Sequence, residues 1–195
     1  DGADPGIWRG YNRPAFLQPT DPNFERIARL YYKELTRLYG KADYYSMDPF
    51  HEGGSTAGVD LNLAGQAIWK AMKRANPRSA WVVQAWGANP RPDMIKDLPA
   101  GNVVVLDLFS ESRPQWGDAS STWYRKEGLG THDWLYCMLL NYGGNVGLHG
   151  KMAHVIHEFY KAKESPFGER LKGVGMTTEG IEKNPEMYEL LCEIP

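Results

Sequence analysis

Two glutamates in this sequence follow short apolar segments and precede a glycine. Glu52 comes after residues 44–50, and Glu179 comes after residues 171–176. The two lie far apart in the sequence, so only the tertiary fold can bring them together. Two opposed carboxylates can hydrolyse a glycosidic bond, because one protonates the leaving oxygen while the other attacks the sugar or activates water. The alternative, that both are solvated loop residues, stays open at this point.

A second pair of carboxylates, Asp107 and Glu111, stands at the end of another apolar run, residues 102–109. Asp107 lies inside that run, and an ionised carboxylate is costly to bury without a partner. Asp107 therefore either bonds the backbone of a neighbouring strand or orients a hydroxyl of a sugar. The residues alone favour neither role.

Three histidines, His149, His154 and His157, are the residues closest to a metal-binding pattern. They lack the His-Glu-x-x-His spacing that places two imidazoles on one face of a helix. The same segment carries apolar side chains, so we predict surface or packing histidines and no metal. A Gly-x-Ser-x-Gly motif, typical of serine hydrolases, is also missing from the sequence.

Alternating strands and helices must position these side chains. Apolar and aromatic runs predict strands at 44–50, 80–87, 102–109, 134–142 and 171–176, and helical periodicity predicts helices at 24–39, 61–75, 92–98, 152–162 and 186–192. This alternation indicates an α/β protein with a parallel sheet. The glycine motifs of nucleotide-binding folds are missing, which argues against a doubly wound fold. The first 22 residues are expected to form a loop.

Polar residues recur where the predicted strands end. They are Glu52, Gln84, Trp86, Asp107, Glu111, Asn141, Asn145 and Glu179. In a (β/α)8 TIM barrel the carboxyl ends of the strands meet at one rim, where catalytic groups lie. A complete barrel needs about 250 residues, whereas this chain has 195. We therefore predict one domain, residues 1–195, that forms a partial barrel from the later strands.

Composition limits the classes of partner. The net charge of −2 gives no basic field for nucleic acid, and no apolar run approaches the length of a membrane span. Seven Trp and eleven Tyr suit a pocket that stacks on sugars, although aromatic residues also fill ordinary cores. Cys137 is predicted to be a buried hydrophobic residue, and a disulfide with Cys192 stays open. The chain begins at Asp1 without a signal peptide, as expected of a processed or excised start.

Five blocks of sequence occur in the order found in the α-N-acetylglucosaminidases of glycoside hydrolase family 89, which the chain resembles from Phe16 to its end. The blocks are YSMDPFHE (45–52), WVVQAW (81–86), LDLFSES (106–112), CMLLNYGGNVGL (137–148) and GMTTEGI (175–181). The resemblance implies a catalytic barrel that, in the family, lies between a small N-terminal domain and an all-helical C-terminal domain. Those domains and the early strands are expected to be absent from this chain and to be its partners.

The resemblance also implies an activity: hydrolysis of terminal α-linked N-acetylglucosamine with retention of configuration and without a cofactor. Glu52 would be the general acid/base and Glu179 the nucleophile, with their carboxyls ~5–5.5 Å apart. The matching blocks further imply that His51, Trp86, Asp107, Glu111, Asn141 and Asn145 bind the carbohydrate substrate.

The sequence departs from mammalian members of the family at three positions. His51 stands where they carry Asn, and Leu140 and Val146 stand where they carry His. The motif at 50–54 is similar to that of bacterial members, which implies a secreted or periplasmic protein. Two alternatives stay open. The substrate's own acetamido group could act as the nucleophile, with Asp48 orienting it, or the chain could be an inactive or sugar-binding fragment.

Overall fold

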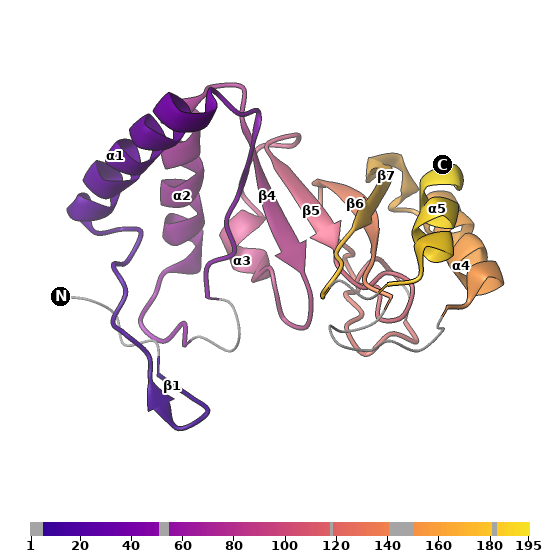
Figure 1. Ribbon diagram of the computed structural model, residues 1–195. Coiled ribbons are helices and arrows are strands. Elements are labelled where there is room, and N and C mark those ends of the chain that lie inside the picture. Colours follow the sequence, from indigo (N-terminus) through magenta and orange to yellow (C-terminus); the bar gives the residue numbers. More distant parts are fainter. Residues whose placement is uncertain (1–5, 51–54, 118, 141–149, 181–182) are drawn as a thin grey trace. The chain divides into compact units, whose positions relative to one another are not determined.

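The computed structural model describes residues 6–50, 55–117, 119–140, 150–180 and 183–195 (Figure 1). Its helices are α1 (Pro22–Tyr39), α2 (Leu61–Ala75), α3 (Pro92–Ile95), α4 (Met152–Glu164) and α5 (Pro185–Glu193), with a 3-10 turn at Gly168–Arg170. Its strands are β1 (Ile7–Trp8), β2 (Tyr11–Asn12), β3 (Tyr44–Ser46), β4 (Ala80–Ala85), β5 (Val103–Asp107), β6 (Asp133–Met138) and β7 (Leu171–Met176). None of the helices in these ranges has the length and apolar character that crossing a bilayer requires.

The five longer strands, β3 to β7, form one sheet in the order of the sequence. The pairs β3–β4, β5–β6 and β6–β7 are parallel, as the alternation of strands and helices predicts. The strand predicted at 44–50 ends early, at Ser46. Pro49 has no N–H to donate, and Phe50 has a φ of 59°, so neither residue fits an extended strand.

The N-terminal segment differs from the loop expected there, because β1 and β2 pair as a short antiparallel hairpin. Its turn residues, Arg9 and Gly10, have φ values of 49° and 85°. Two successive positive φ values define the tight turn that matches the twist of a hairpin. The strands are only two residues long, too short for a periodic pattern in the sequence.

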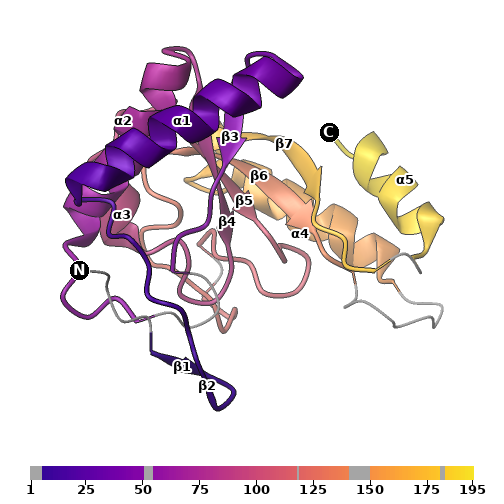
Figure 2. The same cartoon turned by 60° about the vertical axis from the view of Figure 1, so that its left-hand side comes forward.

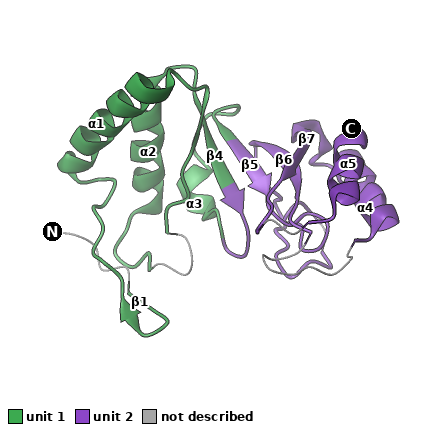
Figure 3. Ribbon diagram, in the orientation of Figure 1, with its two compact units in different colours: residues 1–83, 89–103 green, residues 84–88, 104–195 purple. Residues whose placement is uncertain are grey.

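The chain divides into two compact units, residues 1–83 with 89–103 and residues 84–88 with 104–195 (Figure 3). The division passes through β4 and β5, where the sequence has neither a linker nor a change in composition. The sequence predicts one domain, residues 1–195, and the described residues cluster into these two compact units within it.

In the first unit, α1 and α2 lie side by side (Figure 2). Asp21 caps α1 by accepting a 2.8 Å hydrogen bond from Asn23 N–H, and Gly40 ends it with a φ of 81°. Much of the predicted apolar face of this helix is exposed, although Phe24 and Leu35 are half-buried, and none of its residues is fully buried. The core of the unit consists instead of residues from α2, α3, β3 and β4, including Tyr45, Ile68, Met72, Trp81, Val83 and Met94.

In the second unit, α4 and α5 supply the helical part of the core. The α4 side chain Phe159 packs edge-on against Tyr136 of β6, with ring centroids 5.6 Å apart. Trp134 stacks on Trp116 at 6.3 Å and donates a 3.0 Å hydrogen bond to Phe167 O. These contacts attach the long loop after β5 and the turn after α4 to β6.

Candidate active site

The predicted site residues divide into two groups. His51, Glu52, Asn141 and Asn145 lie outside the described residues. Trp86, Asp107, Glu111 and Glu179 lie inside them, and all four belong to the second unit. Within that unit they lie at or after the carboxyl ends of β4, β5 and β7.

Glu179 follows the carboxyl end of β7 and is exposed. Two residues before it, Thr177 bonds to the end of the neighbouring strand β6 and to the residue that follows β5. Its N–H donates to Met138 O at 3.1 Å, and its hydroxyl donates to Leu108 O at 2.6 Å. Gly180 then turns the chain with a φ of 69°, a conformation that glycine adopts without strain. The backbone just before Glu179 is therefore fixed by the two hydrogen bonds of Thr177.

Asp107 is the last residue of β5 and has no exposed surface. Its two carboxylate oxygens accept the N–H of Gln115, at 3.3 and 3.0 Å. Burial raises the pKa of Asp107 to about 7, although the bond from Gln115 and the charge of Arg125 act in the opposite direction. Of the two roles considered for Asp107, the described contacts support bonding to the backbone, in this case that of a loop.

Gln115 extends this contact to the end of β4, a role that the sequence did not reveal. Its side-chain amide donates a 3.0 Å hydrogen bond to Gly87 O. Gly87 has a φ of 53°. It directly follows Trp86, whose side chain is half-buried. Asp107 and Gln115 thus hold the backbone beside Trp86. A glutamine in a polar loop belongs to no sequence motif. Only its complete burial in the structure identifies it as a residue that supports the site.

Glu111 follows β5 by four residues and is only 9% exposed. Its Oε1 accepts two backbone hydrogen bonds, from Leu139 N–H at 3.1 Å and from Leu140 N–H at 2.6 Å. Burial raises the pKa of Glu111 to about 7, these bonds lower it, and the nearby charge of Asp107 raises it slightly further. In the described structure Glu111 therefore contacts the end of β6.

No three His, Cys, Asp or Glu side chains gather to form a metal site in the part of the chain that the structure describes. His154 Nε2 lies 2.9 Å from Glu111 O, and His157 is exposed on α4. His149 lies outside the described residues. These positions agree with a surface or packing role for His154 and His157.

The disulfide left open by the sequence is not formed, because Cys137 and Cys192 are both free thiols. Cys137 is buried in β6, and Cys192 is exposed on α5. Burial raises the pKa of the Cys137 thiol well above its usual range, so it behaves as the small hydrophobic residue predicted.

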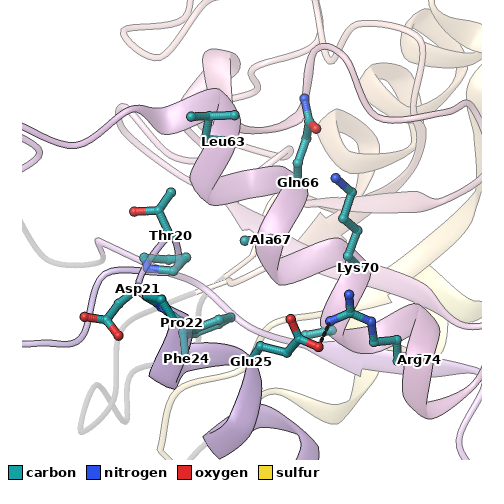
Figure 4. A pocket seen from close by; sticks show the side chains of 12 residues that line it. Thr20, Asp21, Pro22, Phe24, Glu25, Leu63, Gln66, Ala67, Lys70 and Arg74 are labelled. Atoms are coloured by element: carbon teal, nitrogen blue, oxygen red, sulfur yellow. Dashed lines mark ion pairs between the residues drawn. The ribbon is translucent and has the colours of Figure 1, made fainter.

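The first unit has a surface hollow of about 380 Å³ between the start of α1 and one face of α2 (Figure 4). Glu25 and Arg74 form an ion pair of 2.6 Å at its edge, and both side chains are mostly exposed. Asp21, the other carboxylate in the lining, caps α1. The hollow contains none of the predicted site residues and offers no opposed carboxylates for hydrolysis.

Comparisons with known proteins identify the family of this chain. Residues 3–195 match the family model described as alpha-N-acetylglucosaminidase (NAGLU) TIM-barrel domain. The chain is 30% identical to human alpha-N-acetylglucosaminidase over an alignment of 195 residues. The alignment covers 94% of this chain and 25% of the human protein. It therefore spans about a quarter of the length of that relative.

Solved structures agree with the predicted fold. A family 89 glycoside hydrolase from Clostridium perfringens, in complex with PUGNAc, is 29% identical with a TM-score of 0.85, covering 100% of this chain and 22% of that one. A form of the C. perfringens enzyme with two glutamates replaced by glutamine, in complex with its substrate GlcNAc-alpha-1,4-galactose, is 30% identical with a TM-score of 0.82, covering 99% and 21%. These matches confirm a partial (β/α)8 barrel. The chain belongs to the alpha-N-acetylglucosaminidase TIM-barrel domain family of glycoside hydrolase family 89.

Proposed function

We propose that the polypeptide carrying this chain is a glycoside hydrolase that removes terminal, non-reducing α-linked N-acetylglucosamine from glycans. One observation carries the proposal: 99% of the chain matches a family 89 enzyme whose structure was determined with GlcNAc-alpha-1,4-galactose as substrate. The name of the human relative supports the same sugar and the same anomer. The carbohydrate is thus the partner that the site must recognise, and the reaction needs no cofactor.

The proposed mechanism is a double displacement with retention, in which Glu52 is the general acid/base and Glu179 the nucleophile. Support comes from the bacterial relative, in which two glutamates were replaced by glutamine for the substrate complex. Glu179 is exposed on a backbone that Thr177 holds at two points, as a nucleophile requires. In the first step Glu179 attacks the anomeric carbon while Glu52 protonates the leaving oxygen; water then releases the sugar.

The sugar pocket is proposed to include His51, Trp86, Asn141 and Asn145. The half-burial of Trp86 leaves part of its indole available to stack on a sugar ring. Asp107 and Glu111 were expected to bind substrate as well. Because their described contacts are with backbone N–H groups, we assign them to the support of the loops.

We also propose that the natural polypeptide is bacterial and secreted or periplasmic. The motif at 50–54, which is similar to that of bacterial members, supports this assignment. Further domains of the same polypeptide are the proposed partners of this barrel segment, since the chain spans only about a quarter of its human relative.

The test is hydrolysis of aryl α-N-acetylglucosaminides by the natural polypeptide and by its Glu52→Gln and Glu179→Gln variants. We expect Glu179→Gln to lose several orders of magnitude in kcat with every leaving group. We expect Glu52→Gln to be impaired chiefly with poor leaving groups, which need protonation. Glu189→Gln, which changes an exposed carboxylate on α5, is the matched control. Wild-type activity in both catalytic variants would refute the assignment.

A further inference from the structure

The Glu111 carboxylate joins the loop after β5 to the end of β6. The last residue of β6 is Met138, so the N–H groups of Leu139 and Leu140 lie beyond the strand. Both residues are buried, and a buried N–H without an acceptor is strongly unfavourable. A single oxygen, Glu111 Oε1, accepts both hydrogen bonds, at 3.1 and 2.6 Å. The end of β6 therefore depends on this side chain for its hydrogen bonding.

Leu140 also has an unfavourable backbone conformation. Its φ is 67°, in the left-handed region that residues other than glycine rarely adopt. Such a residue keeps its conformation only when surrounding contacts impose it. The shorter of the two Glu111 bonds, at 2.6 Å, is made to Leu140 itself.

Further hydrogen bonds connect this point to the segment that carries Glu179. Met138 O accepts the N–H of Thr177 at 3.1 Å, and Leu139 O accepts the hydroxyl of Tyr188 at 3.2 Å. Thr177 lies two residues before Glu179. The backbone from Met138 to Leu140 is thus held by Glu111 through its N–H groups and in turn holds β7 and α5 through its carbonyls.

We propose that Glu111 is a positioning residue that acts on Glu179 through the paired ends of β6 and β7. The inference rests on the proposed function, because it assigns Glu179 a role in the reaction. In this role Glu111 acts through the backbone: Oε1 accepts two backbone N–H groups, and the side chain is nine-tenths buried. A displacement of about 1 Å at a reacting group can cost about 10²-fold in rate, so a support of this kind affects kcat.

The test uses kcat and KM for an aryl α-N-acetylglucosaminide, measured on the natural polypeptide. Glu111→Gln keeps a side-chain oxygen that accepts both N–H groups, and we expect its kcat and KM to stay within about threefold of wild type. Glu111→Leu keeps the size but removes the acceptor, and we expect kcat to fall about 10²-fold while KM changes less than threefold. Glu189→Gln, on the exposed face of α5, is the control for loss of a carboxylate.

Hydrogen exchange gives a second readout, which does not depend on activity. In Glu111→Leu, the amides of Leu139, Leu140 and Thr177 should exchange faster, while amides in the middle of β6 stay protected. Glu111→Asp, whose shorter side chain cannot reach both N–H groups, and Tyr188→Phe should change kcat in the same direction. These two variants provide the test if Glu111→Leu does not fold.

Two results would overturn the proposal. An unchanged kcat in both Glu111→Leu and Glu111→Asp would show that the end of β6 does not need this carboxylate. A KM raised more than tenfold in Glu111→Gln would instead show direct contact with the sugar. Glu179→Gln, measured in the same series, separates this inference from the proposed function: full activity there removes the role of Glu179, whatever the Glu111 variants show.

Discussion

Gly175 of β7 lies directly opposite Cys137 of β6, and a Cβ on Gly175 would lie 2.6 Å from the Cys137 sulfur. Side chains on neighbouring strands normally share the space between them. Here the Cys137 thiol fills that space, with a methyl group of Leu135 beside it, because position 175 has no side chain. The two strands that precede the proposed site therefore pack through a glycine and a buried thiol.

Gly175→Ala should destabilise the second unit. Overpacking of a tight core typically costs ~1–3 kcal/mol, and the new methyl group would meet the sulfur of Cys137. Urea denaturation of the chain measures the change in the free energy of unfolding. The control is the double variant Cys137→Ala/Gly175→Ala, which removes the sulfur and should recover part of the loss. Strictly additive losses in the double variant would contradict the steric explanation.

The two cysteines should react at very different rates. Cys192 is exposed and Cys137 is buried with a raised pKa, so a thiol reagent should modify Cys192 in the native chain. The measurement is a thiol titration with and without denaturant, followed by mass mapping. One fast thiol when native and two when unfolded is the expected result, and Cys192→Ser should abolish the fast reaction. Rapid native labelling of Cys137 would contradict the buried position.

The contribution of Asp107 and Glu111 to the free energy of unfolding of the second unit should fall as pH rises towards neutrality. Both have a pKa raised to about 7, so the folded chain holds protons that the unfolded chain releases near pH 4. Their contribution is complete below about pH 4 and is lost as pH rises through about 7, at up to ~1.4 kcal/mol per pH unit for each group.

Urea unfolding between pH 4 and pH 8 measures this dependence. Asp107→Asn, which cannot ionise, should show a shallower fall than wild type across the range. Asp133→Asn is the matched control, since Asp133 carries the same group at the other end of β6 and lies beside Arg170 and Lys172. Equal slopes for wild type and Asp107→Asn would show that Asp107 is ionised throughout.

Azide tests whether Glu179 is the nucleophile. Glu179→Ala opens space beside the anomeric carbon, so azide should restore turnover and yield a glycosyl azide of inverted configuration if Glu179 is the nucleophile. The product is identified by NMR. The acetamido group of an α-linked substrate is cis to the leaving oxygen and cannot displace it from the opposite face, so the absence of an inverted azide from Glu179→Ala would remove the nucleophile role of Glu179.

Much of the fold follows from local sequence signals. Asn76-Pro77 ends α2 at Ala75, and Gly40 ends α1 at Tyr39, each at the residue that the sequence predicts. The strand predicted at 134–142 shows where such signals fail. In the structure β6 ends at Met138, because the next N–H groups turn to Glu111, whose position 28 residues earlier gives no local sign of the contact.

The sequence predicts the residue types of the candidate site but not the contacts that the structure describes. Carboxylates after apolar strands were visible in the sequence, and the five blocks indicated the family. Gln115 and Tyr188 were missed, because a buried amide and a tyrosine on an amphipathic helix look like ordinary loop and core residues. Their hydrogen bonds to Gly87 O and Leu139 O depend on the tertiary fold alone.

Helix α1 has a practical consequence for anyone who purifies this chain. Ile27, Leu30, Tyr31 and Leu38 are each more than half exposed along a helix that buries none of its residues. An apolar stripe in water favours self-association, so we expect the isolated chain to sediment as larger species when concentrated. Sulfate should strengthen that tendency and mild urea should weaken it, because they act on apolar hydration in opposite directions. Buffer choice will therefore decide whether solution measurements on this chain are made on a monodisperse sample.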